Sequence, residues 1–237
     1  MSSTPLFSDR TSAGEKLAQR IFEELNQIKA AGISAKPLVY ALPRGGIPIA
    51  APIARLLGCP IDIVLAKKIT RPENPELAIG ACTASGHVIW SEPKPFRKNP
   101  QNLREEALRQ AQEKAQAQFA EFSPYCPQIS PQGAIAILVD DGLATGMTMA
   151  VAVQALKAQN PEQVWISAPV APAELMTWLQ QWSDRAIVLE TPHPFLSVSR
   201  FYAEFPQVET DEALAYLQQH NAPFLSQHIE PDVSSSS

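Results

Sequence analysis

The stretch 134–148, AIAILVDDGLATGMT, contains the features that decide the fold. Six apolar residues end abruptly at Asp140 and Asp141, and a Thr-Gly-Met-Thr turn then leads into a segment with helical spacing over 146–159. A continuous apolar run that stops at a turn is typical of a strand buried on both faces. The order strand, turn, helix is the unit from which parallel sheets are built.

The same stretch also indicates chemistry. Two adjacent carboxylates at a strand end repel each other unless hydroxyl groups, a metal ion or water meet them. Residues 145–148 offer two hydroxyls, backbone N–H groups and a helix N-terminus, a combination that cradles a phosphate. The alternative is a solvated turn in which Thr145 caps the helix. That alternative requires the whole string 140–148 to be a coincidence.

The rest of the chain repeats the alternation of strands and helices. The predicted fold class is therefore α/β: three layers, with a mostly parallel sheet covered by helices on both faces. We predict one domain over 1–230 and a disordered tail over 231–237. The predicted helices cover 15–29, 47–57, 99–122, 146–159, 173–182 and 211–219, and the predicted strands cover 38–42, 61–66, 134–139, 164–170 and 186–189.

Two segments interrupt this alternation, and such interruptions carry substrate in folds of this kind. Residues 67–90 combine a polar stretch with a small hairpin, 77–83 paired with 87–90, and are expected to form a flap. Residues 190–206 are expected to form a small hood. The Gln- and Ala-rich helix 99–122 fits either a dimer surface or a cap on the sheet. We expect interior packing for Trp165, Trp178 and Trp182.

A second unusual turn, Pro43-Arg44-Gly45-Gly46, follows the predicted strand 38–42. Its adjacent glycines let backbone N–H groups turn outward, and Arg44 beside a helix N-terminus favours an anion. An ordinary turn with a surface arginine is the alternative. Ligands of open parallel sheets bind at the carboxyl ends of strands, so the two turns together predict a sugar with phosphate at both ends. The chain has neither the glycine fingerprint of dinucleotide sites nor a P-loop lysine.

Composition narrows the function classes. The 237 residues are 45% hydrophobic and 18% charged, which fits a globular chain and excludes a disordered one. The net charge of −5 argues against nucleic acid or an anionic membrane as partner. Three widely spaced cysteines indicate reduced thiols and no sulfur-bound metal. No segment reaches the ~20 apolar residues of a membrane span, so a cytoplasmic location is expected.

Residues 137–148, ILVDDGLATGMT, resemble the signature of the type I phosphoribosyltransferases, which bind phosphoribosyl diphosphate (PRPP). Further motifs look like those of one subfamily of predicted phosphoribosyltransferases: ALPRGG at 41–46, Lys67-Lys68 followed by NPELAIGA at 74–81, and Pro194-Phe195 with Phe201-Tyr202 and Phe205. This resemblance runs from about Phe7 to Leu217, nearly the whole chain.

The resemblance implies a role for each matching residue. The acidic pair would hold the ribose 2′- and 3′-hydroxyls with Mg²⁺ nearby, and 144–148 would bind the 5′-phosphate. Arg44 and Gly45 would receive the pyrophosphate, helped by Lys68, while Arg71 and the segment to Glu76 would belong to the flap. The implied PRPP-binding residues are Arg44, Gly45, Gly46, Lys68, Asp140, Asp141, Gly142, Ala144, Thr145, Gly146, Met147 and Thr148. The implied catalytic residues are Arg44, Lys68, Asp140 and Asp141. The implied metal ligands, directly or through water, are Asp140 and Asp141. The implied hood residues around the acceptor are Phe195, Phe201 and Tyr202.

The implied reaction displaces pyrophosphate from PRPP by a nitrogen base or a related nitrogen nucleophile, with Mg²⁺ as cofactor. Ala144 stands where enzymes that act on 6-oxopurines carry an aspartate, and an alanine cannot transfer a proton. A 6-oxopurine is therefore disfavoured, and an adenine-like, orotate-like or different nucleophile stays open. Gly142 replaces a larger residue of the broader family, and Ser199 replaces an expected glycine of the hood.

The alternative function is a non-catalytic protein of the same fold that senses PRPP or a nucleotide and regulates another process. Related transferases often pair, so a homodimer is expected. The physiological direction of the transfer stays open, because the reaction is reversible in principle.

Overall fold

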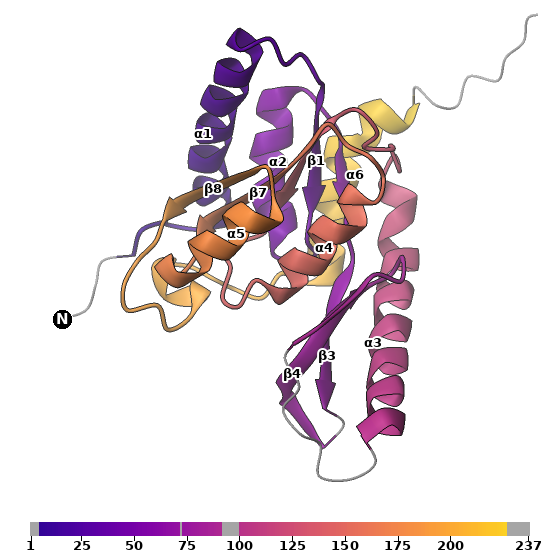
Figure 1. Cartoon of the computed structure of the whole chain (residues 1–237). Coiled ribbons are helices and arrows are strands. Elements are labelled where there is room, and N and C mark those ends of the chain that lie inside the picture. The colour runs from indigo at the N-terminus through magenta and orange to yellow at the C-terminus, as the bar shows by residue number, and fades with distance from the viewer. Residues whose placement is uncertain (1–4, 72, 92–99, 227–237) are drawn as a thin grey trace, which may run out of the picture.

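The computed structural model describes residues 5–71, 73–91 and 100–226, so the predicted tail over 231–237 lies outside the described residues. A five-stranded sheet with the order β2-β1-β6-β7-β8 forms its centre (Figure 1). All four strand pairings are parallel, which confirms the predicted α/β fold. The strands are β1 (Pro37–Ala41), β2 (Ile61–Ile63), β6 (Ile135–Val139), β7 (Gln163–Val170) and β8 (Arg185–Glu190).

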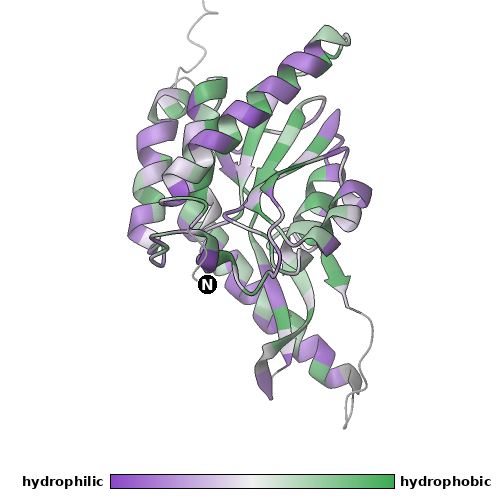
Figure 2. Cartoon of the chain, turned by 90° about the vertical axis from the view of Figure 1, so that its left-hand side faces the viewer, coloured by the Kyte–Doolittle hydropathy of each residue, from purple (hydrophilic) through white to green (hydrophobic). Residues whose placement is uncertain are grey.

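Helices cover both faces of this sheet. The helices α1 (Arg10–Ala30), α2 (Gly46–Leu57) and α6 (Thr210–Ser226) pack on one face, and α4 (Met147–Lys157) and α5 (Met176–Trp182) pack on the other. Side chains of β6 alternate between the two cores: Ile137 joins the core under α1 and α2, whereas Leu138 joins the core under α4. Figure 2 shows that the strands of the central sheet are largely hydrophobic, whereas the helices around them alternate between hydrophilic and hydrophobic segments.

A second, antiparallel sheet projects from the first. It consists of β3 (Ala66–Arg71), β4 (Asn74–Thr83) and β5 (Val88–Trp90), and α3 (Pro100–Phe122) lies along it (Figure 1). Ile69, Ile79 and Cys82 pack against Ala107 and Ala111 in a small core of their own. The helix α3 therefore caps this hairpin sheet, while Phe122 at its end is buried in the core under α1 and α2.

The hairpin sheet corrects two predictions. The strand predicted over 61–66 ends at Ile63, and the polar stretch predicted over 67–76 contains β3 and the first residues of β4. The physical reason is that β3 buries only Ile69 fully, so its sequence shows no apolar run. Pairing with β4 defines this strand, and such long-range pairing is not visible in a short window.

Several helix boundaries also differ from prediction. The helix α1 begins at Arg10 rather than 15, because Asp9 and Ser12 form a capping box. The helix α6 continues to Ser226, and the predicted helix 173–182 begins with a 3₁₀ turn, η2 (Ala173–Leu175). Two further 3₁₀ turns are η1 (Ser123–Tyr125) and η3 (Val198–Phe201).

Three other expectations can be compared directly. Trp165 is fully buried as predicted, but Trp178 is 55% exposed, so its predicted interior packing is wrong. It lies on α5, whose buried residue is Leu179, and so it points away from the sheet. All three cysteines are free and buried, in agreement with reduced thiols. Among the described helices, none combines the length and apolar character needed to cross a membrane.

Candidate functional site

The strand order creates a crevice between β1 and β6. These two strands are neighbours, with Ala41 opposite Val139, while β2 lies beyond β1 and β7 lies beyond β6. The connections after β1 and β6 therefore diverge to opposite sides of the sheet. Ligands of open α/β sheets bind at such a point, outside the carboxyl ends of the strands. The turns 43–46 and 140–146, the two turns singled out in the sequence, begin there.

Two glycines bring these turns into contact. A Cβ atom on Gly46 would lie 2.6 Å from the carbonyl oxygen of Val139, and one on Gly45 would overlap the carboxylate of Asp141. Gly45 has an ordinary φ of −61°, so close approach, not backbone conformation, requires glycine at this position. The peptide between Pro43 and Arg44 is cis. The predicted pyrophosphate loop and acidic pair are thus assembled as one site.

Arg10 is part of this site, although the sequence analysis missed it. Its Nε donates a hydrogen bond to Asp141 Oδ2 over 2.8 Å, and its Nη1 donates to the carbonyl oxygen of Pro206 over 2.7 Å. The guanidinium carbon lies 3.6 Å from the centre of the Phe205 ring. The Tyr202 hydroxyl donates to the backbone carbonyl of Asp141 over 2.6 Å. The sequence offered one signal for Arg10, which is its position in the first turn of α1. The apolar spacing did not show this turn, because it predicted a helix that begins at 15.

The two aspartates have different surroundings. Burial raises the pKa of Asp140 well above its usual range, and the neighbouring Asp141 charge raises it further. Burial also raises the pKa of Asp141, but the hydrogen bond and charge of Arg10 oppose this effect. The Asp141 N–H donates to Asp140 Oδ1 over 2.9 Å. In the part of the chain that the structure describes, no cationic side chain forms an ion pair with Asp140, so Asp140 is the carboxylate that gains most from a bound cation.

These residues fit Mg²⁺ as a cation shared with a ligand. Magnesium typically takes one or two carboxylates and completes its shell with water and substrate phosphates. Asp140 can hold the ion directly or through water, and Asp141 can contribute the oxygen that Arg10 does not hold. Within 5–71, 73–91 and 100–226, no group of three or more His, Cys, Asp or Glu is arranged to hold a metal without such help.

The predicted phosphate loop, 144–148, leads into α4. Gly146 has a φ of 69°, a conformation that favours glycine, and it caps the N-terminus of α4. A Cβ atom on Gly142 would overlap the side chain of Val198 in η3 and lie 2.9 Å from the side chain of Val170. This contact explains glycine at 142: the hood occupies the space that a larger residue would need.

The structure separates the two adjacent lysines of β3. Lys68, the residue implied by the resemblance, is exposed and lies opposite Ala81 of β4. Lys67 is half-buried, and its pKa is lowered first by burial and then by the positive charges of Arg44 and Lys114. The electrostatic field of Arg44 therefore acts on Lys67. The Arg44 side chain also donates to Thr210 Oγ1 over 3.1 Å.

The segment after β8, which the sequence analysis predicts to form the hood, contains stacked aromatic rings. The ring centres of Phe195 and Phe201 are 5.0 Å apart, and those of Tyr202 and Phe205 are 4.8 Å apart. Phe201 and Tyr202 are buried in the core under α1 and α2, so they support the hood from below. A cleft of about 460 Å³ between hood and acidic pair is lined by Arg10, Arg44, Gly45, Asp141, Phe205, Gln207 and Val208.

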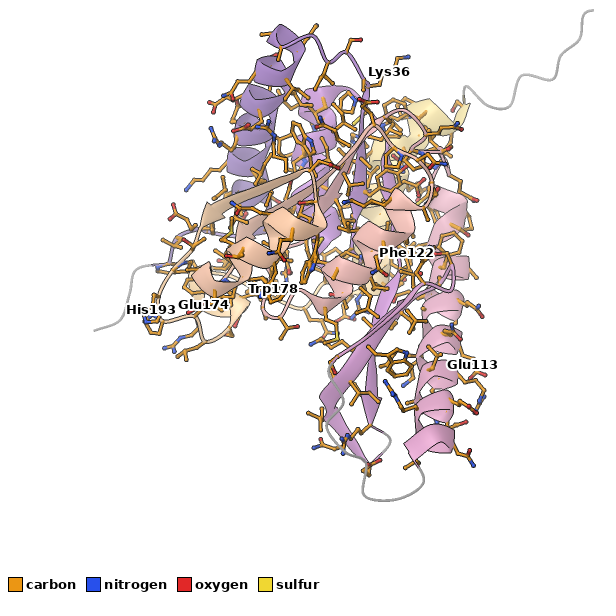
Figure 3. All side chains as sticks on the ribbon, in the orientation of Figure 1. Lys36, Glu113, Phe122, Glu174, Trp178 and His193 are labelled. Atoms are coloured by element: carbon orange, nitrogen blue, oxygen red, sulfur yellow. The ribbon has the colours of Figure 1, made fainter. Side chains whose placement is uncertain are left out.

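A second cavity, of about 540 Å³, lies on the other side of the phosphate loop. Ala144, Thr145 and Met147 form one wall, and aromatic side chains that include Trp178 form another. Trp178 and Glu174 lie together beside α5 in Figure 3. Ala144 thus faces a largely apolar space.

Comparisons with known proteins agree with this geometry. A family model described as phosphoribosyl transferase domain matches residues 9–176. Two Mycobacterium tuberculosis proteins, from strains CDC 1551 / Oshkosh and ATCC 25618 / H37Rv, are named provisionally as phosphoribosyl transferases. Each is 32% identical over 221 residues, which are 92% of this chain and 48% of the relative. The chain thus spans about half the length of these curated relatives.

A solved structure extends the comparison to three dimensions. The crystal structure of the protein TT1426 from Thermus thermophilus is 30% identical in sequence and superposes with a TM-score of 0.71. The match covers 90% of this chain and 98% of that chain. Most of the chain therefore has a counterpart of known structure.

Proposed function

The chain belongs to the phosphoribosyl transferase domain family, and on this premise we propose that it transfers ribose 5-phosphate from PRPP to a nitrogen nucleophile, with Mg²⁺ as cofactor and pyrophosphate as the second product. One observation carries the proposal. The turn 43–46 and the turn 140–148 are in contact through Gly45 and Asp141, across two neighbouring strands. A sugar with phosphate groups at both ends fits this pair of turns.

Each part of the site has a role in this proposal. The N–H groups at the start of α4 bind the 5′-phosphate, since a helix N-terminus favours an anion. Asp140 accepts hydrogen bonds from ribose hydroxyls, and Asp141 is held in place by Arg10. Arg44 and Lys67 oppose the negative charge that develops on the departing pyrophosphate. When bound, Mg²⁺ supplies further positive charge to that leaving group.

The reaction needs water to be excluded while the bond between ribose and pyrophosphate breaks. The hairpin sheet carries Lys67 and is the segment that would close over PRPP. The acceptor would enter beneath the hood, near Phe195 and Phe205. Because Ala144 offers no group for proton transfer, we propose a nucleophile other than a 6-oxopurine.

The experiment is pyrophosphate release by the full chain from PRPP and Mg²⁺ across a panel of free bases and simple amines. The double variant Asp140→Asn/Asp141→Asn serves as the blank. Asp184→Asn serves as a matched control, because Asp184 accepts a hydrogen bond from the Val164 N–H at the start of β7, away from the carboxyl ends of the strands. Release with one acceptor, retained in the control and absent in the blank, supports the proposal. PRPP binding without release with any acceptor would instead favour a sensor protein, and unchanged PRPP binding by the double variant would overturn the site assignment.

A further inference from the structure

A cavity of about 410 Å³ lies at the far end of α4 from the phosphate loop. Ala155 and Leu156 of α4 line it, whereas the phosphate loop precedes the first residue of the same helix. Its other walls come from the end of α3, the edge strand β2 and the turn between β4 and β5. These elements meet beside α4 in Figure 1. The cavity is therefore separate from the proposed PRPP site.

Asp62 of β2 is the charged residue of this cavity. Its Oδ1 accepts a hydrogen bond from the Ile63 N–H over 2.8 Å, and its Oδ2 accepts one from the Ile129 N–H over 3.2 Å. The Tyr40 hydroxyl donates to the Ile129 carbonyl over 2.8 Å. The N–H and the carbonyl group of Ile129 are thus both hydrogen-bonded, so this wall of the cavity is already ordered without a ligand. Among the described residues, no cationic side chain forms an ion pair with Asp62.

Two side-chain amides of the lining add uncharged acceptors. The side-chain amide of Gln128 donates to the Ser123 carbonyl over 3.4 Å, and that of Gln159 donates to the Ala155 carbonyl over 3.2 Å. Each amide therefore keeps its own oxygen available as an acceptor. The described lining contains no lysine, arginine or histidine. Because Asp62 is the charged residue of this lining, the cavity favours a cation over a phosphate.

Apolar groups complete the lining. Phe119 presents an aromatic ring, and Val64 and Leu156 add aliphatic surface. The volume lies within the roughly 300–1,000 Å³ of small-molecule sites. A single carboxylate among apolar walls is a poor site for a bare metal ion, which needs several oxygen ligands. It suits an organic cation, because the ring can stack against a cation and the carboxylate can pair with it.

We propose that this cavity binds a small organic cation, a primary amine or an amidine with an apolar body, whose N–H groups bond to Asp62. The inference is independent of the proposed transferase activity, because it uses no residue of the PRPP site.

The charge state of the cavity supports this inference. Burial raises the pKa of Asp62 to about 6, so the carboxyl group is ionised at pH 8. Tyr40 of β1 and Cys126, after η1, are the titratable groups on which the charge of Asp62 acts. Burial raises the pKa of both, so both are neutral at that pH. The facing residues of α3 and α4, Gln116, Phe119, Ala155, Leu156 and Gln159, are uncharged.

The test uses benzamidine as the probe and its neutral analogue benzamide, measured by calorimetry with the full chain at pH 8. We expect benzamidine to bind and benzamide to bind at least tenfold more weakly. Asp62→Asn should weaken benzamidine binding at least tenfold, since it removes the charge of the acceptor. Asp184→Asn is the matched control, because Asp184 also accepts a backbone N–H but lies outside the cavity. Asp140→Asn should leave binding unchanged.

A second pair of variants tests the location even if Asp62→Asn does not fold. Gln116 lines the cavity mouth and is exposed on α3, and Ala117 is exposed beside it without lining the cavity. Gln116→Trp should reduce benzamidine binding at least tenfold, whereas Ala117→Trp should not change it. The proposal is overturned if benzamidine does not bind, if benzamide binds equally well, if Gln116→Trp binds as the parent does, or if Asp140→Asn abolishes binding.

Discussion

The guanidinium of Arg10 forms an ion pair with the carboxylate of Asp141, over 2.8 Å and 131 positions of sequence. Both side chains are largely buried, with 10% and 16% of their surfaces exposed. The pair connects the start of α1 to the turn after β6. The Arg10 guanidinium also stacks on the ring of Phe205, which connects the pair to the hood. It also makes the two adjacent aspartates unequal, because one already has a cation and the other does not.

Replacing Arg10 should destabilise the fold. Arg10→Gln leaves Asp141 buried without its cation, and the loss of one partner from a buried pair costs about 3 kcal/mol or more. Urea unfolding at pH 7.5 measures this change in the free energy of unfolding. Arg109→Gln is the control, since Arg109 pairs with Glu106 and Glu113 on the exposed surface of α3 and should give no measurable change. Equal stability of Arg10→Gln and the parent would contradict the role assigned to the ion pair.

The two lysines of β3 should differ in function. Lys67→Met should weaken PRPP binding about tenfold, a loss of about 1.4 kcal/mol, because Lys67 shares the electrostatic environment of Arg44. Lys68→Met should change binding less than twofold, since Lys68 is exposed. Titration calorimetry with PRPP and Mg²⁺ compares the two variants directly. The reverse result would return the pyrophosphate contact to Lys68, as the family resemblance implies.

Gly142 and Val198 should be energetically coupled. Gly142→Ala introduces a methyl group into space that Val198 occupies, and overpacking of this kind costs roughly 1–3 kcal/mol. Val198→Ala in the Gly142→Ala background should recover part of the lost stability, because it removes the overlapping atoms. A double-mutant cycle from unfolding free energies gives the coupling. Additive effects of the two substitutions would show that the hood does not press on Gly142.

Stability should depend on pH through Asp62. Its folded pKa of about 6 lies above the usual value of 3.8, so folding favours the protonated form, and this contribution is lost as pH rises through 6. Relative to the parent, Asp62→Asn should therefore gain about 1 kcal/mol of stability between pH 5 and pH 8. Urea unfolding at both values measures the change. A difference between the two proteins that does not vary with pH would show that Asp62 has an ordinary pKa.

The sequence predicted the central sheet because its strands are buried on both faces. Runs such as 134–139 are apolar without interruption, and each ends at a turn whose residues cannot continue the strand. The two turns were expected at one rim because the carboxyl ends of parallel strands lie on the same side of a sheet, whereas the pairing of β1 with β6 is known only from the structure. For these strands, the local sequence is therefore enough to predict the secondary structure.

The features that were missed depend on contacts between distant residues. The strand β3 has one fully buried side chain, Ile69, and is defined by its partner β4. Arg10 meets Asp141 only because folding brings them together across 131 positions, and nothing near Arg10 in the sequence indicates this contact. The choice between Lys67 and Lys68 likewise depends on which face of β3 each occupies. Adjacent residues of a strand point to opposite faces, and a one-residue uncertainty in register exchanges their environments.

The small core shared by the hairpin sheet and α3 includes no residue of the central sheet. Substitutions confined to this small core therefore leave in place the buried side chains around β6, the strand that precedes Asp140. During evolution the small core can be remodelled as an exchangeable cassette, provided that Lys67, the residue proposed to oppose the charge of the pyrophosphate, is kept. A lineage that acquires a new acceptor need not rebuild the scaffold that holds the donor.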